Sequence, residues 1–244
     1  MFKKYTGKLY CFSPPVMLAT FLIEFGMAGY TLWRYKLNTV SRLAVAMLLT
    51  LGTFQLAEYM VCGGLGLTNI EWARTGYGAI ALLPALGVHM VVAISGKKRP
   101  VLVAAAYASC AAFVGFYLIA EGAMNGQTCY ANYAVFHAER GSVWPFMAYY
   151  YGWLLTGTIL AVQWGNQLPA RRKALHSMAL GYLVFILPTT TFNILDPSTT
   201  KAIPSIMCGF AVLLAFVLVI RVLPSSSPLR QPAGRLKSVL RSRA

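Results

Sequence analysis

The stretch ISGKKRPVLVAAAYASCAAFVGFYLIAEG, residues 94–122, decides the fold of this chain. Three basic residues, Lys97, Lys98 and Arg99, are followed by an uncharged apolar run that ends at Glu121. A helix rises 1.5 Å per residue, so about 20 such residues cross the hydrocarbon core of a bilayer. Basic residues gather at the cytoplasmic ends of such helices. The stretch therefore predicts a transmembrane helix that starts in the cytoplasm.

Six further stretches on either side of this one have span length. The seven predicted spans are 14–33, 43–62, 75–95, 101–121, 146–165, 175–195 and 203–223. The chain is 58% hydrophobic and 11% charged, against about 25% charged residues in a soluble domain. We therefore predict an all-α polytopic membrane protein, a seven-transmembrane-helix bundle over 14–223. An outer segment, 1–13, and a basic cytoplasmic tail, 224–244, flank it, and the longest outer gap, 122–145, is expected to be a loop.

The basic residues alternate between the two sides of the predicted bundle. Fifteen of the 21 Lys and Arg lie after the first, third, fifth and seventh spans. The positive-inside rule places these gaps in the cytoplasm, with the N-terminus outside and the C-terminus inside. Lys3, Lys4 and Lys8 oppose this orientation, but four later gaps agree with one another.

The net charge of +15 lies in short clusters beside the spans, which favours anionic lipid headgroups over nucleic acid. Each Lys or Arg near such a surface contributes about 1 kcal/mol. The residues expected to contact the inner membrane surface or a partner are Arg171, Arg172, Lys173, Arg235, Lys237 and Arg241. The segment 235–243 is compatible with a short basic amphipathic helix on the membrane and equally with a disordered tail.

Three of the five cysteines fall at or beyond the outer boundary, where an oxidising exterior permits a disulfide. Cys62 ends the second span, and Cys129 lies in the long outer gap. We favour a Cys62–Cys129 bond that pins this gap over the bundle. Cys11 competes as a partner, and three free thiols are the other alternative.

Three ionisable residues lie inside predicted spans, where such groups are costly and indicate function. They are Glu24, Glu58 and His89. Helix rise separates Glu58 from His89 by about 15 Å along the membrane normal, too far for one zinc ion, whose ligands lie about 2 Å away. The seventh span has no lysine for a retinal Schiff base. We expect no metal, no cofactor and no catalytic residue.

Polar and aromatic side chains gather in the outer half of several spans. The expected ligand-binding set is Glu24, Gln55, Glu58, Tyr77, Tyr150, Trp153, Thr190 and Asn193. Above an aliphatic inner half, this distribution predicts a ligand cavity open to the exterior. The alternative is hydrogen bonding between helices, together with an aromatic belt at the membrane interface.

Several stretches resemble one family, the seven-helix membrane sensor region at the N-terminus of some bacterial histidine kinases and diguanylate cyclases. The stretch 71–96 is similar to that family's Trp–x–x–x–x–Tyr–x–x–Ile–x–Leu–Leu–Pro pattern. The residues that carry it are Trp72, Tyr77, Ile80, Leu82, Leu83 and Pro84. The RRK-Ala-Leu entry at 171–175 and the Val-Leu-Pro close at 222–224 also fit. The resemblance implies a sensor of an extracellular or lipid-soluble cue.

No kinase or cyclase sequence follows the seventh span, so we expect signalling through a cytoplasmic partner. The first hypothesis is thus a stand-alone, non-enzymatic sensor or receptor-like module of the bacterial inner membrane. The second is a structural or assembly subunit of a larger membrane complex. The third is an integral membrane enzyme that uses Glu24 or Glu58.

Overall fold

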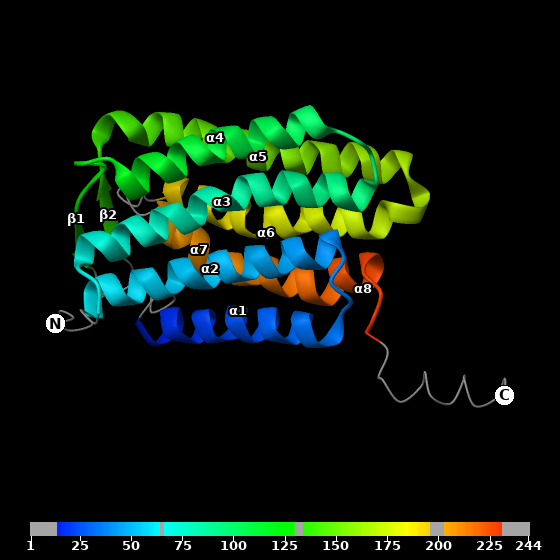
Figure 1. The fold of residues 1–244 in the computed structure, drawn as a ribbon, viewed down its shortest axis with the longest axis horizontal. Coiled ribbons are helices and arrows are strands. Elements are labelled where there is room, and N and C mark those ends of the chain that lie inside the picture. Colours follow the sequence, from blue (N-terminus) through cyan, green and yellow to red (C-terminus); the bar gives the residue numbers. More distant parts are fainter. Residues whose placement is uncertain (1–13, 64–65, 130–133, 196–202, 231–244) are drawn as a thin grey trace.

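A computed structural model describes residues 14–63, 66–129, 134–195 and 203–230. Its long helices lie side by side along the longest axis of the molecule (Figure 1). They are α1 (Pro14–Arg34), α2 (Thr39–Gly63), α3 (Asn69–Ser95), α4 (Pro100–Ile119), α5 (Arg140–Gln167), α6 (Arg172–Leu195) and α7 (Ile203–Val217). A 3₁₀ turn, η1 (Pro169–Arg171), precedes α6. A π-helical segment, η3 (Leu218–Val222), and the short α8 (Leu223–Ser226) follow α7.

Within the described ranges, six helices are long and apolar enough to cross a membrane. The all-α membrane class and six of the expected spans are thereby supported. α5 is not among the six. It has 28 residues, but tyrosines, glycines and terminal polar residues dilute its apolar content.

α3 is the centre of the bundle, and α4 is peripheral. In the most apolar stretch of each helix, 83% of the residues of α3 are buried but only 17% of those of α4. α3 packs against α2, α4 and α5, while α6 packs against α5 and α7. Small residues allow this close approach: a Cβ on Gly87 of α3 would collide with the hydroxyl of Tyr182 from α6.

The segment expected to be a loop forms a β-hairpin and the first turn of α5. β1 (Met124–Cys129) pairs antiparallel with β2 (Ala134–Ala138), and a bulge lies between Met124 and Gln127. α5 starts at Arg140 because the Glu139 carboxylate accepts hydrogen bonds from the backbone N–H groups of Gly141 and Ser142.

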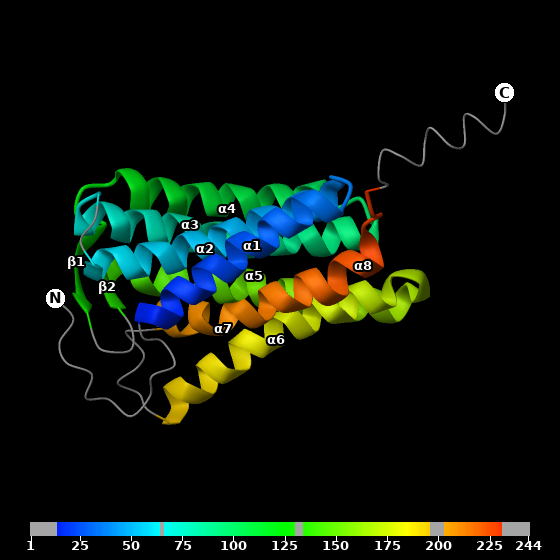
Figure 2. The same cartoon turned by 90° about the horizontal axis from the view of Figure 1, so that it is seen from below.

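The hairpin lies across one end of the bundle, and we call this the hairpin end (Figures 1 and 2). α2, α4 and α6 end there, and α1, α3, α5 and α7 begin there. Arg74 links α3 to the end of α4 here. Its guanidinium donates hydrogen bonds to the carbonyl oxygens of Leu118 and Ala120 at 3.0 Å each. The short connections between helices and α8 lie at the opposite end.

Cys62 at the end of α2 is bonded to Cys129 at the end of β1, the pairing that the sequence favours. Their Cα atoms lie 5.9 Å apart. The bond attaches the hairpin to α2 across 67 residues of sequence. Cys110 and Cys208 are buried free thiols, and Cys11 lies outside the described residues.

Candidate functional site

Two carboxyl groups and an amide are buried near the hairpin end. Glu24, Glu58 and Gln55 have exposed fractions of 0%, 1% and 2%. Gln55 and Glu58 are three residues apart and share one face of α2. A Cβ built on Gly52, one turn before Gln55, would lie 3.5 Å from the Cβ of Glu24. Glu24 of α1 therefore faces the same side of α2.

α7 completes this group with two further polar side chains. Ser205 and Cys208 are both buried and lie one turn apart. Cys208 is a neighbour of both Glu24 and Glu58. We call these five residues, Glu24, Gln55, Glu58, Ser205 and Cys208, the polar cluster. Three helices, α1, α2 and α7, contribute to it.

The polar cluster holds the first residue of β2 by both of its backbone groups. The N–H of Ala134 donates to Oε1 of Glu58 at 3.1 Å. The hydroxyl of Ser205 donates to the carbonyl oxygen of the same residue. Side chains from α2 and α7 thus meet on one residue of the hairpin, and we call this arrangement the clasp.

Aromatic packing seats the hairpin on the bundle. The ring of Phe136 in β2 lies 5.6 Å from Phe54 of α2 and 5.7 Å from Tyr77 of α3, measured between centroids. Ala134, Phe136 and Met124 are buried. Phe136 therefore packs β2 against α2 and α3.

Two of the five residues of the polar cluster have buried polar atoms without hydrogen-bond partners among the described residues. Among the described residues nothing bonds to either carboxyl oxygen of Glu24 or to Nε2 of Gln55. An unsatisfied buried polar group costs about 1–3 kcal/mol, and such groups in a native protein require an explanation. Packing therefore does not explain why Glu24 is a glutamate.

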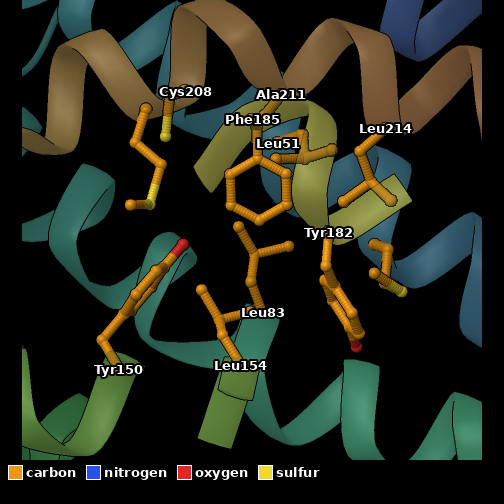
Figure 3. A pocket seen from close by; sticks show the side chains of 11 residues that line it. Leu51, Leu83, Tyr150, Leu154, Tyr182, Phe185, Cys208, Ala211 and Leu214 are labelled. Carbon is orange, nitrogen blue, oxygen red and sulfur yellow. The ribbon is translucent and has the colours of Figure 1, made fainter. Parts of the chain in front are cut away.

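Two small apolar cavities lie deeper in the bundle. The one in Figure 3 is lined by residues that include Tyr150, Tyr182, Phe185 and Cys208. In each cavity the centre of a water molecule can occupy a volume of about 10 Å³. This is the lower limit for a cavity that holds a single water. Neither is lined by Glu24, Gln55 or Glu58, and of the expected ligand set only Tyr150 lines them.

The remaining residues of the expected ligand set are not brought together with the carboxyl groups. Tyr77 and Tyr150 are core residues in a group of packed rings around Phe146. Their burial argues against an interface belt for these two side chains. Trp153 lies between α5 and α4, where Nε1 donates to Oγ of Ser109 at 3.0 Å.

The polar residues at the end of α6 bond within their own helix. The exposed Thr190 donates its hydroxyl hydrogen to the Ile186 carbonyl at 2.8 Å. The side-chain amide of Asn193 donates to the Thr189 carbonyl at 2.9 Å. A hydroxyl that donates to the carbonyl one turn earlier already has a partner within its own helix, so it does not indicate a ligand site.

His89 lies away from the polar cluster, between α3 and α4. Its Nδ1 is 3.1 Å from the hydroxyl of Tyr107. No group of three or more His, Cys, Asp or Glu residues that could hold a metal ion occurs in the part of the chain that the structure describes.

Basic side chains gather at the end opposite the hairpin. Arg171, Arg172 and Lys173 are exposed there. Lys97 lies beside the same connection, since its Nζ donates to Oε1 of Gln167 at 2.8 Å and lies 5.1 Å from the centre of the Trp164 ring. Arg235, Lys237 and Arg241 lie outside the described residues.

Sequence reasoning missed Ser205 and the residue it holds, Ala134. Ser205 stands at the start of an apolar span and looks like a small packing residue, and Ala134 carries no polar side chain. The signal that was available is the Cys62–Cys129 pairing, which brings the outer gap onto α2 and hence close to Glu58.

Comparison of the chain with protein-family models, with curated proteins and with solved structures gave no match. The geometry of the polar cluster and the distribution of charge therefore carry the functional argument.

Proposed function

We propose that the chain is an integral protein of the bacterial inner membrane with seven spans, the hairpin end outside and the C-terminus in the cytoplasm. α5 supports the seventh span, because it runs alongside the six apolar helices (Figure 1) and packs against α3 and α6. Its Leu155, Ile159 and Val162 are exposed apolar side chains, suited to lipid. The basic residues at the end opposite the hairpin support the orientation.

We further propose that the protein is a non-enzymatic, receptor-like sensor module that responds at the polar cluster. The unpartnered carboxyl group of Glu24 carries this proposal. Ionisable groups inside membrane spans mark binding sites and proton pathways. The family resemblance around residues 71–96 points in the same direction.

The proposed sensor signals through a cytoplasmic partner. The exposed residues Arg171, Arg172 and Lys173 offer a basic surface at the cytoplasmic end. Acidic groups of a cytoplasmic protein and anionic lipid headgroups both fit such a surface. α7 runs from Ser205 and Cys208 to η3 and α8 at this end, so it links the polar cluster with the cytoplasmic face.

A structural subunit of a larger complex is the second candidate, and α4 favours it. Its outward face carries small exposed side chains, Ala104, Ala105, Ala108, Ala111 and Ala112. Small residues at helical spacing allow another transmembrane helix to approach closely.

Replacing Glu24 with leucine should stabilise the protein. The change removes an unpartnered buried carboxyl, so we expect the free energy of unfolding to rise by about 1–3 kcal/mol. Glu58 is the matched control, because its carboxyl is hydrogen-bonded and Glu58→Leu should lower stability. Thermal unfolding of the purified full-length protein measures both. A loss of stability in Glu24→Leu equal to that in Glu58→Leu would contradict a binding role for Glu24.

A pull-down from native membranes with tagged wild type and tagged Glu24→Leu separates the two candidate functions. A sensor should recover a partner in amounts that change severalfold between the two proteins, because the variant cannot change state. A structural subunit should recover the same partners in the same amounts from both. The second result would favour the subunit role and refute the sensor.

A further inference from the structure

The chain that follows α8 is attached to the connection between α1 and α2. Residues 227–230, which we call the strap, form an antiparallel bridge with the residues at the end of α1. The N–H of Arg230 donates to the carbonyl oxygen of Arg34 at 2.9 Å, and the N–H of Lys36 donates to that of Pro228 at 3.0 Å. Figure 2 shows the strap, in red, beside the blue connection.

The bridge places three cationic side chains at one corner of the molecule. Arg34, Lys36 and Arg230 are all exposed, and we call them the basic corner. Arg34 and Arg230 lie opposite each other across the bridge, and like charges in opposite positions of paired strands are destabilising. The carbonyl end of α1 supplies only about half a negative charge, which does not balance three cations.

The acidic residues of the chain belong to the other end of the bundle. The sequence has six Asp and Glu residues, and none precedes Glu24 or follows Asp196, so the residues after Arg230 add no acidic side chain. Asp196 comes directly after α6, which ends at the hairpin end. The five acidic residues that the structure describes lie at or near the hairpin end: Glu24, Glu58, Glu71, Glu121 and Glu139. An anion that balances the basic corner therefore comes from outside the chain.

The side chains around the basic corner indicate a membrane lipid as the source of this anion. Trp33, directly before Arg34, is 71% exposed, and its ring centre lies 6.3 Å from that of the exposed Tyr30. Such aromatic side chains lie at the level of the lipid headgroups. Leu37 and Leu229 are exposed as well. Cations beside exposed apolar side chains match a phospholipid, which carries its phosphate next to its acyl chains.

We propose that the basic corner binds the phosphate of an anionic phospholipid, and that the bound headgroup holds the strap on the α1–α2 connection. Guanidinium groups bind phosphate through paired hydrogen bonds. A phosphate between Arg34 and Arg230 offsets their repulsion, so the lipid and the strap stabilise each other. The site is separate from the basic residues 171–173, and it rests on the proposed membrane insertion but not on the sensor role.

Native mass spectrometry of the full-length protein in detergent tests the site, with phosphatidylglycerol as the anionic probe and phosphatidylcholine as the zwitterionic one. We expect phosphatidylglycerol to bind more tightly. Replacing Arg34 and Arg230 together with glutamine should weaken its binding roughly tenfold or more. Replacing Arg171 and Arg172 with glutamine is the matched control, since it removes the same charge from exposed positions at the same end and should leave the tightest-bound lipid in place.

Three results would overturn the lipid site. They are equal affinity for the two lipids, equal weakening by the two pairs of substitutions, and displacement of the lipid by a large excess of glycerol phosphate, which would assign the corner to a soluble anion. Should the Arg34 and Arg230 double variant fail to fold, Arg230→Gln alone decides and should weaken binding severalfold. Its side chain is exposed and follows the last helix, so the fold does not depend on it.

Hydrogen–deuterium exchange in lipid nanodiscs tests the effect on the strap. Exchange of peptides covering residues 223–230 should be severalfold slower with phosphatidylglycerol than with phosphatidylcholine alone. The Arg34 and Arg230 double variant should exchange at the same rate in both lipids. Wild-type rates that do not differ between the lipids would refute the coupling of lipid and strap. Neither experiment involves a protein partner or the polar cluster, so the lipid site and the sensor can fail separately.

Discussion

Replacing Cys62 and Cys129 together with serine should lower the free energy of unfolding by about 2–4 kcal/mol. The bond closes a segment of 67 residues that contains all of α3 and α4. Without it the unfolded chain gains conformational freedom, and the hairpin is held by the clasp and by packing such as that of Phe136 and Val135. Thermal unfolding of the purified protein in detergent measures the loss.

A reductant supplies the control for the disulfide. Wild type treated with it should approach the stability of the double-serine variant, which should itself be insensitive to the treatment. The pairing would be refuted if the reductant left the wild-type transition in place and the double variant unfolded at the same temperature as wild type.

Gly87→Ala should lower the free energy of unfolding by about 2–3 kcal/mol, the upper range for overpacking. A Cβ at this position of α3 collides with the Tyr182 hydroxyl of α6. Gly157 of α5 confines the same ring, since a Cβ there would lie 3.2 Å from it. The ring therefore cannot move aside without disturbing the contacts of α6 with both helices.

Tyr182→Phe should rescue Gly87→Ala. The colliding atom is the hydroxyl oxygen, which has no hydrogen-bond partner among the described residues, so its removal alone should cost little. Gly152→Ala is the matched control, because nothing lies within 4 Å of a Cβ at that exposed position in α5. We expect it to be neutral or slightly stabilising. Equal stability losses in the single and double variants would show that the Tyr182 hydroxyl is not the obstacle.

The local hydropathy pattern is sufficient to predict the long helices. The stretch 94–122 contains α4, whose ends at Pro100 and Ile119 lie within two residues of the expected 101–121. α5 begins six residues before its apolar run, because the Glu139 cap extends the helix into polar sequence. The hairpin was missed because Met124–Cys129 is short and contains Asn and Gly, which are weak strand formers.

The candidate site could be predicted only in part. The cost of burying a charge singles out Glu24 and Glu58 from sequence alone, and helical spacing adds Gln55. Ser205 and Ala134 join them through contacts between distant segments, and no local pattern encodes such contacts. Thr190 and Trp153 have suitable chemistry, but the rotation of their helices directs them elsewhere.

Cysteine labelling of intact cells tests the seven-span topology most directly. In a background with Cys11 replaced by serine, single cysteines replace Leu67 near the hairpin end, and Lys98, Arg171 or Arg230 at the opposite end. A membrane-impermeant maleimide should label position 67 and leave 98, 171 and 230 unlabelled until the cells are opened. Labelling of position 171 with position 98 protected would show that α5 does not cross the membrane. Labelling of both 98 and 230 in intact cells would show that the protein has the opposite orientation.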